Sequence, residues 1–427
     1  MRETEALIQE TLVTEELPSG LQVAVIPRPG QRRTYATFAT FYGSIDSHFR
    51  LPDSGEMVDV PDGIAHFLEH KLFEKPSGDV MSDFSRLGAS TNAYTEYLTT
   101  TYLFSTTEHA EQCLEILLDF VQDPYFTPEN VEKEKGIIEQ EIRMYLDMPG
   151  DRLHSNLMKA LYVKHPVRLD IAGSVESIRQ ITPEELYQCY GTFYHPSNMW
   201  LLVDGDVDPD RVIDQIRDNQ ARKDFHRQPA IPRVLPDEPE HIQQERIAQT
   251  MPVALPMLAV GYKDPVSDLS GSALVRRELI TDMMWSLIVG RSSPLFFELY
   301  EAGLINDRFS AQYEAAPTYA YSVLSGETRD PDRLLEQIQR GLARVRFDQA
   351  ALERQKKRNQ GQFTALFNNP GQLAYAYNSF HVRDVPLLHY LDELESISLR
   401  DIEERFEEHV REDRRALSLI QPEHTER

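Results

Sequence analysis

Two histidines and a glutamate stand within five residues of one another, as His66, Glu69 and His70. If this segment is helical, the two imidazoles lie four residues apart on one face, with about 6 Å between their Cβ atoms. Imidazoles at that spacing can share a zinc ion, and the glutamate beside them can take a proton from water without ligating the metal. The order H-x-x-E-H inverts the commoner H-E-x-x-H pattern. The motif predicts peptide hydrolysis, with Glu69 as the general base.

A catalytic zinc site needs a third protein ligand, and a five-residue motif alone also fits an exposed helix with two chance histidines. Downstream, Thr127 and Pro128 provide a cap and a first-turn proline for a helix that continues to residue 144. A glutamate-rich helix is usually a solvated face. Spacing alone does not choose among its four candidate ligands, which are Glu132, Glu134, Glu139 and Glu141.

These segments together resemble the metallopeptidases of family M16, which include insulin-degrading enzyme, pitrilysin and the mitochondrial processing peptidase. The resemblance rests on the H-x-x-E-H motif and on the later run E-K-G-I-I-E-Q-E, which ends at Glu141. In that family the second of two glutamates seven residues apart ligates zinc, and the first supports a ligand. The resemblance therefore implies one zinc ion per chain, held by His66, His70 and Glu141, with Glu134 as the supporting residue.

Residues 87–95, with the sequence L-G-A-S-T-N-A-Y-T, resemble the edge strand of the active site in the same family. There an Asn-Ala pair meets the backbone of an extended substrate, because an unpaired strand edge can add a peptide as a further strand. The resemblance implies that Asn92 and Ala93 bind substrate; without it, an ordinary hairpin strand is the simpler interpretation. Further matches at residues 165–174 and 194–198 extend the likeness over most of residues 15–205.

Length and composition limit the class of protein. A chain of 427 residues with 41% hydrophobic side chains can form two or three domains. Its 44 basic and 69 acidic side chains give a formal net charge of -25, which argues against binding nucleic acid. No apolar run approaches the ~20 residues of a membrane span, and the amino terminus has no signal-peptide pattern. We expect a cytoplasmic protein without a membrane partner, in which Cys113 and Cys189 are buried and unpaired.

The order of predicted elements suggests two halves. Strands are expected at 21–25, 35–42 and 98–104, and helices at 108–121, 128–146, 151–162 and 183–193. Prolines interrupt charged residues at 222–249, and similar elements then begin again without an H-x-x-E-H motif. The resulting prediction is a zinc-binding catalytic domain at 1–221, a linker at 222–249 and a homologous domain at 250–427.

The expected fold class is α+β. The resemblance implies two homologous halves, each a mainly antiparallel sheet with helices packed on one face, in the metallohydrolase fold of the M16 and LuxS type.

The second half departs from the family at one important place. Active members usually place an Arg and a Tyr around a Gly-Leu step, where they hold the substrate carbonyl and the developing oxyanion. The corresponding segment, Leu299 to Asn306, contains no Arg, and Asn306 stands where the Tyr is expected. Bacterial members with two kinds of subunit suggest an explanation: a heterodimer, enclosing a chamber for peptides, in which a paralogous M16-like subunit supplies the Arg and Tyr.

Other interpretations remain open from the sequence. Arg291 or Tyr313 could substitute for the missing pair within a homodimer. The chain could also be a catalytically silent assembly subunit of a larger complex, or a zinc hydrolase that acts on small amides.

Overall fold

The computed structural model describes residues 1–5, 10–266 and 269–423, and it divides into two compact units. Unit 1 contains Met1–Ile142, Asp170–Leu235 and Leu366–Asn378. Unit 2 contains Arg143–Leu169, Pro236–Ala365 and Ser379–Arg427. Within the described ranges, no helix is long and apolar enough to cross a membrane.

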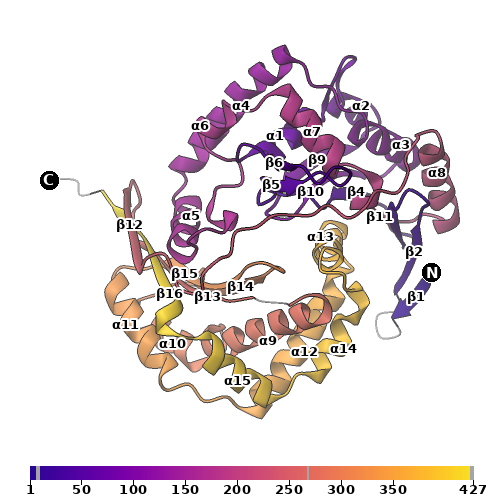
Figure 1. Cartoon of the computed structure of the whole chain (residues 1–427). Coiled ribbons are helices and arrows are strands. Elements are labelled where there is room, and N and C mark those ends of the chain that lie inside the picture. Colours follow the sequence, from indigo (N-terminus) through magenta and orange to yellow (C-terminus); the bar gives the residue numbers. More distant parts are fainter. Residues whose placement is uncertain (6–9, 267–268, 424–427) are drawn as a thin grey trace. The chain divides into compact units, whose positions relative to one another are not determined.

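A seven-stranded sheet lies at the centre of unit 1, in the order β1-β2-β3-β11-β4-β10-β9 (Figure 1). Neighbouring strands are antiparallel except β3 and β11, which are parallel. The strand bounds are β1 Arg2–Glu5, β2 Glu10–Glu16, β3 Gln22–Pro27, β4 Thr34–Thr40, β9 Ser90–Thr95, β10 Thr100–Thr106 and β11 Met199–Gly205. Two short hairpins accompany the sheet, formed by β5 His48–Arg50 with β6 Met57–Asp59, and by β7 Glu74–Lys75 with β8 Gly78–Asp79.

Helices of unit 1 pack on this sheet and bury a continuous apolar core. Helix α3 contacts β4 and β10, α8 contacts β3, and α1 contacts both β9 and β10. The helices are α1 Ile64–Lys71, α2 Met81–Arg86, α3 Ala110–Val121, α4 Pro128–Asp147, α6 Val175–Ile178, α7 Pro183–Phe193 and α8 Pro209–Ala221. The helices expected from the sequence at 108–121, 128–146 and 183–193 are therefore present.

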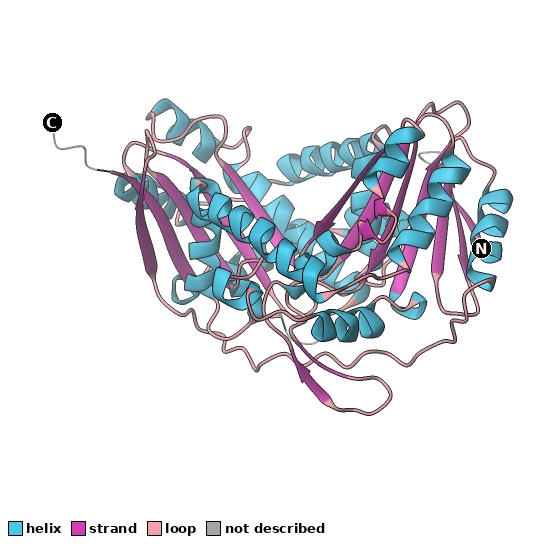
Figure 2. Cartoon of the chain, turned by 90° about the horizontal axis from the view of Figure 1, so that it is seen from above, coloured by secondary structure: helices cyan, strands magenta, loops and turns pink. Residues whose placement is uncertain are grey.

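Unit 2 repeats this plan with a five-stranded sheet in the order β12-β16-β13-β15-β14. Its strands are β12 Arg246–Met251, β13 Met257–Asp264, β14 Ser310–Ala315, β15 Ala320–Glu327 and β16 Arg415–Pro422. Figure 2 shows all strands of the chain in magenta. Strands β12 and β16 are parallel, and the other neighbours are antiparallel. This arrangement matches the order β3-β11-β4-β10-β9 of unit 1. The predicted α+β fold with two homologous, mainly antiparallel halves is confirmed.

The helical layer of unit 2 covers one face of its sheet. Tyr262 and Val260 of β13 point into the same core as Trp285 of α9. The helices are α9 Gly271–Val289, α10 Pro294–Glu301, α11 Pro331–Leu342, α12 Gln349–Leu366, α13 Pro370–His381, α14 Tyr390–Ser396 and α15 Leu399–His409.

Each sheet also carries a segment from the other half of the sequence. Helix α5, Pro149–Leu161, belongs to unit 2 and contacts β13 and β16. A Cβ atom at Gly261 of β13 would lie 2.9 Å from a methyl carbon of Leu157, so glycine permits the close approach of α5. In the reverse sense, residues 366–378 belong to unit 1, where Trp200 Nε1 donates a 2.8 Å hydrogen bond to Asn378 Oδ1. The two units are therefore interleaved along the chain, whereas the sequence predicts contiguous domains.

Charged residues fix the proline-rich segment at 222–249 to both units. Arg233 donates to Asp46 Oδ1 at 2.8 Å within unit 1. Five residues farther along the chain, within unit 2, the carboxylate of Glu238 accepts hydrogen bonds from the backbone N–H groups of residues 163–165 and from Lys263. Only residues 234–237 separate these two attachments, so most of the expected linker is bound structure.

A buried charge cluster stabilises unit 2 around Asp264. Its carboxylate accepts two hydrogen bonds from Arg277, at 2.8 and 3.0 Å, and one from the Tyr313 hydroxyl at 2.6 Å. Arg405 also donates to it, and His409 lies 3.7 Å away. Burial alone would raise the pKa of Asp264, but His409 and the two arginines hold it well below its usual range.

Asp264→Asn is expected to destabilise unit 2 by about 3–5 kcal/mol, because it leaves the buried Arg405 and the partly buried Arg277 with only the exposed carboxylate of Glu408 as counter-charge. Urea unfolding followed by Trp285 fluorescence in a Trp200→Phe background measures this, with the exposed pair partner Asp413→Asn as control. Because the folded pKa of Asp264 is lowered, its stabilisation is complete above the unfolded pKa of about 4 and is lost as pH falls below that value. Equal unfolding midpoints for both variants would contradict this account.

Candidate active site

The H-x-x-E-H motif forms helix α1, and the chain enters this helix through a glycine. Gly63 has φ 90°, in the left-handed region. A Cβ atom there would lie 2.4 Å from the carbonyl oxygen of Ala172, so only glycine fits this contact. His66 and Glu69 are both buried, with exposed fractions of 8% and 9%. The motif therefore lies on a largely buried helix, and not on an exposed helix with two chance histidines.

Glu141 of α4 faces both histidines. Its carboxylate oxygens lie 3.7 Å from His66 Nε2 and 3.4 Å from His70 Nε2. One ligand atom from each of these three residues lies within 4.8 Å of the other two, and they are the one such group found among the described residues. Helix α4 begins where the sequence predicts, because Thr127 Oγ1 accepts a hydrogen bond from the Asn130 N–H at the start of the helix. The structure brings together the three predicted ligands.

The spacing of these atoms suits zinc. Ligands about 2.0–2.2 Å from a tetrahedral ion are separated from one another by roughly 3.3–3.6 Å. The two distances to Glu141 are close to that range, and they exceed a hydrogen bond of normal length. His66 Nδ1 is buried and has no hydrogen-bond partner among the described residues. Two imidazoles and one carboxylate are also a usual donor set for catalytic zinc.

Glu69 lies on the same helix, and a hydroxyl group from the neighbouring strand holds its carboxylate. Thr95 Oγ1, in β9, donates to Glu69 Oε2 at 2.6 Å. Burial raises the pKa of Glu69, and the hydrogen bond from Thr95 acts in the opposite direction. The role of Thr95 could not be assigned from the sequence, because the contact joins a helix and a strand 26 residues apart.

Glu134 supports His70 from the opposite side. Its Oε1 atom lies 3.1 Å from His70 Nδ1, so that Nε2 of the same ring faces Glu141. Its Oε2 atom lies 3.6 Å from Nζ of Lys71, a lysine with no exposed side-chain surface. A carboxylate that binds the second nitrogen of a ligating histidine fixes the orientation and tautomer of the ring. Lys71 was not among the residues that the sequence singled out.

The two histidines differ in their electrostatics. Burial, together with the charge of His70, lowers the pKa of His66 to about 4. Burial alone would also lower the pKa of His70, but Glu134 and the other nearby carboxylates raise it. Burial alone would raise the pKa of Glu134, and its contacts with His70 and Lys71 lower it. The site therefore concentrates negative charge around His70, which favours a bound cation.

Asn92 and Ala93 lie in β9, the last strand in the order of the unit 1 sheet. β9 pairs with β10 through Leu103 opposite Asn92 and Tyr102 opposite Ala93. Asn92 is exposed, and Ala93 faces the core. Since Thr95 belongs to the same strand, β9 connects this sheet edge to Glu69.

The residues considered for the missing Arg and Tyr lie in unit 2. Tyr300 is 49% exposed, and Asn306 donates to Glu327 Oε2 at 3.0 Å. Arg291 donates to the carbonyl oxygen of Asp307. Tyr313 is buried in the Asp264 cluster, where its hydroxyl is already bound.

The two cysteines and two further histidines have structural roles. Cys113 and Cys189 are buried and free, as expected. His165 and His195 each cap a short 3-10 turn through Nδ1, accepting from Val167 N–H and Ser197 N–H respectively.

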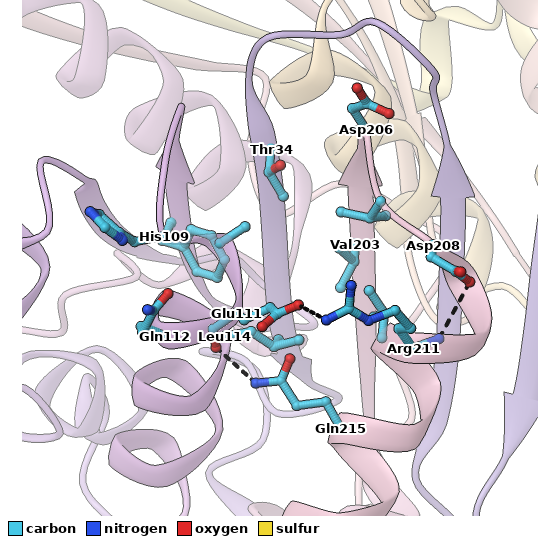
Figure 3. A pocket seen from close by; sticks show the side chains of 14 residues that line it. Thr34, His109, Glu111, Gln112, Leu114, Val203, Asp206, Asp208, Arg211 and Gln215 are labelled. Atoms are coloured by element: carbon cyan, nitrogen blue, oxygen red, sulfur yellow. Dashed lines mark hydrogen bonds and ion pairs between the residues drawn. The ribbon is translucent and has the colours of Figure 1, made fainter.

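A cavity of about 390 Å³ lies elsewhere in unit 1, between the first turns of α3 and α8 (Figure 3). The Arg211–Glu111 ion pair, at 2.8 Å, crosses its lower part, and Gln215 donates to the carbonyl oxygen of Glu111. None of the predicted site residues lines this cavity.

The sequence matches two family models. Residues 53–175 match insulinase (peptidase family M16), and residues 180–359 match the peptidase M16 inactive domain. The second match agrees with helix α9, which contains no histidine.

Individual relatives cover nearly the whole chain. The uncharacterized zinc protease YmfH of Bacillus subtilis (strain 168) is 43% identical over 417 residues, which is 97% of each protein. The crystal structure described as an M16-like peptidase from Alicyclobacillus acidocaldarius is 41% identical, with a TM-score of 0.94 over 97% of this chain and 99% of that one. Pitrilysin, at 17% identity, shares the fold with a TM-score of 0.76 over 99% of this chain and 46% of its own.

Proposed function

Because this chain belongs to the insulinase family of peptidases, M16, we propose that it is a zinc-dependent endopeptidase that cleaves short or unfolded peptides. The observation that carries the proposal is the convergence of His66, His70 and Glu141 on one point. Glu69 lies on the same buried helix as the two histidines. Relatives of this chain are named zinc proteases, which supports the same chemistry.

In the proposed mechanism, His66, His70 and Glu141 hold one zinc ion per chain, and Glu134 orients His70. Bound zinc polarises a carbonyl group and lowers the pKa of water toward about 7. Glu69 accepts the proton of the attacking water and later donates it to the leaving amine. Thr95 holds the Glu69 carboxylate in place at Oε2.

The substrate binds as an extended strand beside β9. Asn92 and Ala93 align its backbone, so that recognition depends little on the side chains of the peptide. This mode suits unfolded substrates, because a folded protein already pairs its own backbone groups.

A paralogous M16-like subunit supplies the Arg and Tyr that this chain lacks, and the two subunits enclose a chamber. Two observations support the heterodimer over a homodimer. Asn306 occupies the position expected for Tyr and binds Glu327. The hydroxyl of Tyr313, the alternative donor, is committed to Asp264.

A catalytically silent assembly subunit is the alternative function. It is less well supported, because burying His66 together with the carboxylates of Glu69 and Glu134 costs free energy, and a site without catalytic use gains nothing from that cost.

The proposal is tested with a quenched-fluorescent peptide of unfolded sequence and the purified chain, with and without its paralogue. Cleavage is expected to stop when zinc is removed by a chelator and to return when zinc is added. Cleavage that persists in the fully zinc-free protein would contradict the proposal. A zinc-loaded complex with no activity on any unfolded peptide would favour the assembly function.

A further inference from the structure

Lys71 is a fully buried lysine directly after the second histidine of the motif. Its side chain has no exposed surface, although burying an ammonium group is costly unless it is paired. Nζ donates a hydrogen bond to Glu74 Oε2 and lies 3.6 Å from Glu134 Oε2. Both partners are carboxylates, and one of them also binds His70. The buried charge is therefore directed at the residue that supports a candidate zinc ligand.

The contacts form a chain of four side chains in unit 1. Glu74 binds Lys71, Lys71 faces one oxygen of Glu134, and the other oxygen of Glu134 lies 3.1 Å from His70 Nδ1. A carboxyl group can rotate about its terminal torsion, which is broad and roughly two-fold. A cation at one oxygen restricts that rotation and so directs the other oxygen at the imidazole. The His70 ring is thereby held with Nε2 toward Glu141.

We infer that Lys71 is a positioning residue that holds Glu134, and through it His70, in the orientation that binds zinc. This inference rests on the proposed function, because it assumes that His70 is a zinc ligand. The ion pairs of Lys71 are with Glu74 and Glu134, neither of which is a predicted zinc ligand. Its effect is therefore expected on zinc affinity and on the strength of the His70–Glu134 contact.

The test measures zinc affinity by competition with a chromophoric chelator, which requires no activity. Lys71→Met is expected to raise the zinc dissociation constant about 10-fold, within the range found for residues that support metal ligands. Glu134→Gln is expected to weaken binding similarly. The double variant should be little worse than Glu134→Gln alone, because Lys71 acts through Glu134.

Lys75→Met is the matched control. Lys75 is also buried, but its Nζ donates to the carbonyl oxygens of Phe120 and Asp123 and does not contact the site. This variant is expected to lose thermal stability while keeping wild-type zinc affinity. If Lys71→Met does not fold, Glu74→Gln provides a second variant, since the Glu74 side chain is 34% exposed. It should weaken zinc binding in the same direction, by less.

The outcomes separate this inference from the proposed function. If the folded Lys71→Met and Glu74→Gln variants bind zinc as tightly as the wild-type chain, the inferred role of Lys71 is wrong. The proposed function is not affected by that result. An equal loss of affinity in Lys75→Met would also overturn it, since the effect would then be general destabilisation. Failure of the wild-type chain to bind zinc would overturn both.

Discussion

Glu69→Gln is expected to lower the rate of peptide cleavage by about 10²- to 10⁴-fold while zinc remains bound. The amide has nearly the shape of the carboxylate and can still accept the hydrogen bond from Thr95, so the local structure should persist. It cannot accept a proton from water at neutral pH. The loss should therefore appear in kcat, measured with a quenched-fluorescent peptide on protein whose zinc content is determined in parallel.

Two glutamates of α4 provide controls for this experiment. Glu132 and Glu139 form surface ion pairs with Lys135 and Arg179, at 3.1 and 2.9 Å, and such pairs contribute little to stability. Glu132→Gln and Glu139→Gln should cleave at the wild-type rate. If Glu69→Gln also cleaves at that rate with zinc bound, Glu69 is not the general base.

Adding a paralogous subunit that carries the family Arg and Tyr is expected to raise the cleavage rate of this chain by about 10²- to 10³-fold. That is the typical effect of one donor that stabilises a developing oxyanion. The described residues of the corresponding segment, Leu299 to Asn306, offer an exposed Tyr300 and an Asn306 already bound to Glu327. The measurement compares kcat for the separate chains and for an equimolar mixture.

The control is a partner in which the Arg and Tyr are replaced by Ala and Phe. It should still associate, as judged by sedimentation, but should not increase the rate. A chain that is fully active alone, and unaffected by either form of the partner, would contradict the heterodimer. Tyr313→Phe in this chain then distinguishes the homodimer, which would require that hydroxyl for catalysis.

The histidine pair could be predicted from sequence because its chemistry is local. His66 and His70 lie one helical turn apart, and a short motif contains that information. The third ligand lies 71 residues beyond His70, and spacing left four glutamates equally eligible. Glu141 and Glu134 were distinguished by resemblance to a family, and the structure places both beside His70.

The contacts of Thr95 and Lys71 could not be predicted in the same way. The Thr95–Glu69 and Lys71–Glu134 contacts depend on how α1 packs against elements distant in sequence, which no local pattern describes. A lysine after H-x-x-E-H reads as an exposed helix terminus, and its burial arises from the packing of α1 with the rest of unit 1.

The restart of similar elements after residue 249 was predictable, since alternating and apolar runs mark several strands in each half. The exchange of α5 and residues 366–378 between the units was not. Both segments have an ordinary amphipathic sequence. Such a pattern predicts that one helix face is buried, but not which part of the chain covers that face. The attachment of the 222–249 segment through Arg233 and Glu238 has the same cause, because charged residues among prolines are typical of free linkers.

The zinc content of the purified chain, measured beside that of Glu141→Ala prepared identically without chelators, tests the central claim most directly. We predict about one zinc ion per wild-type chain and little or none in the variant. Both proteins should be folded, because Glu141 is partly exposed and is not part of the buried core. A folded wild-type chain that takes up no zinc even when the metal is added, or a Glu141→Ala variant that retains it fully, would contradict the account.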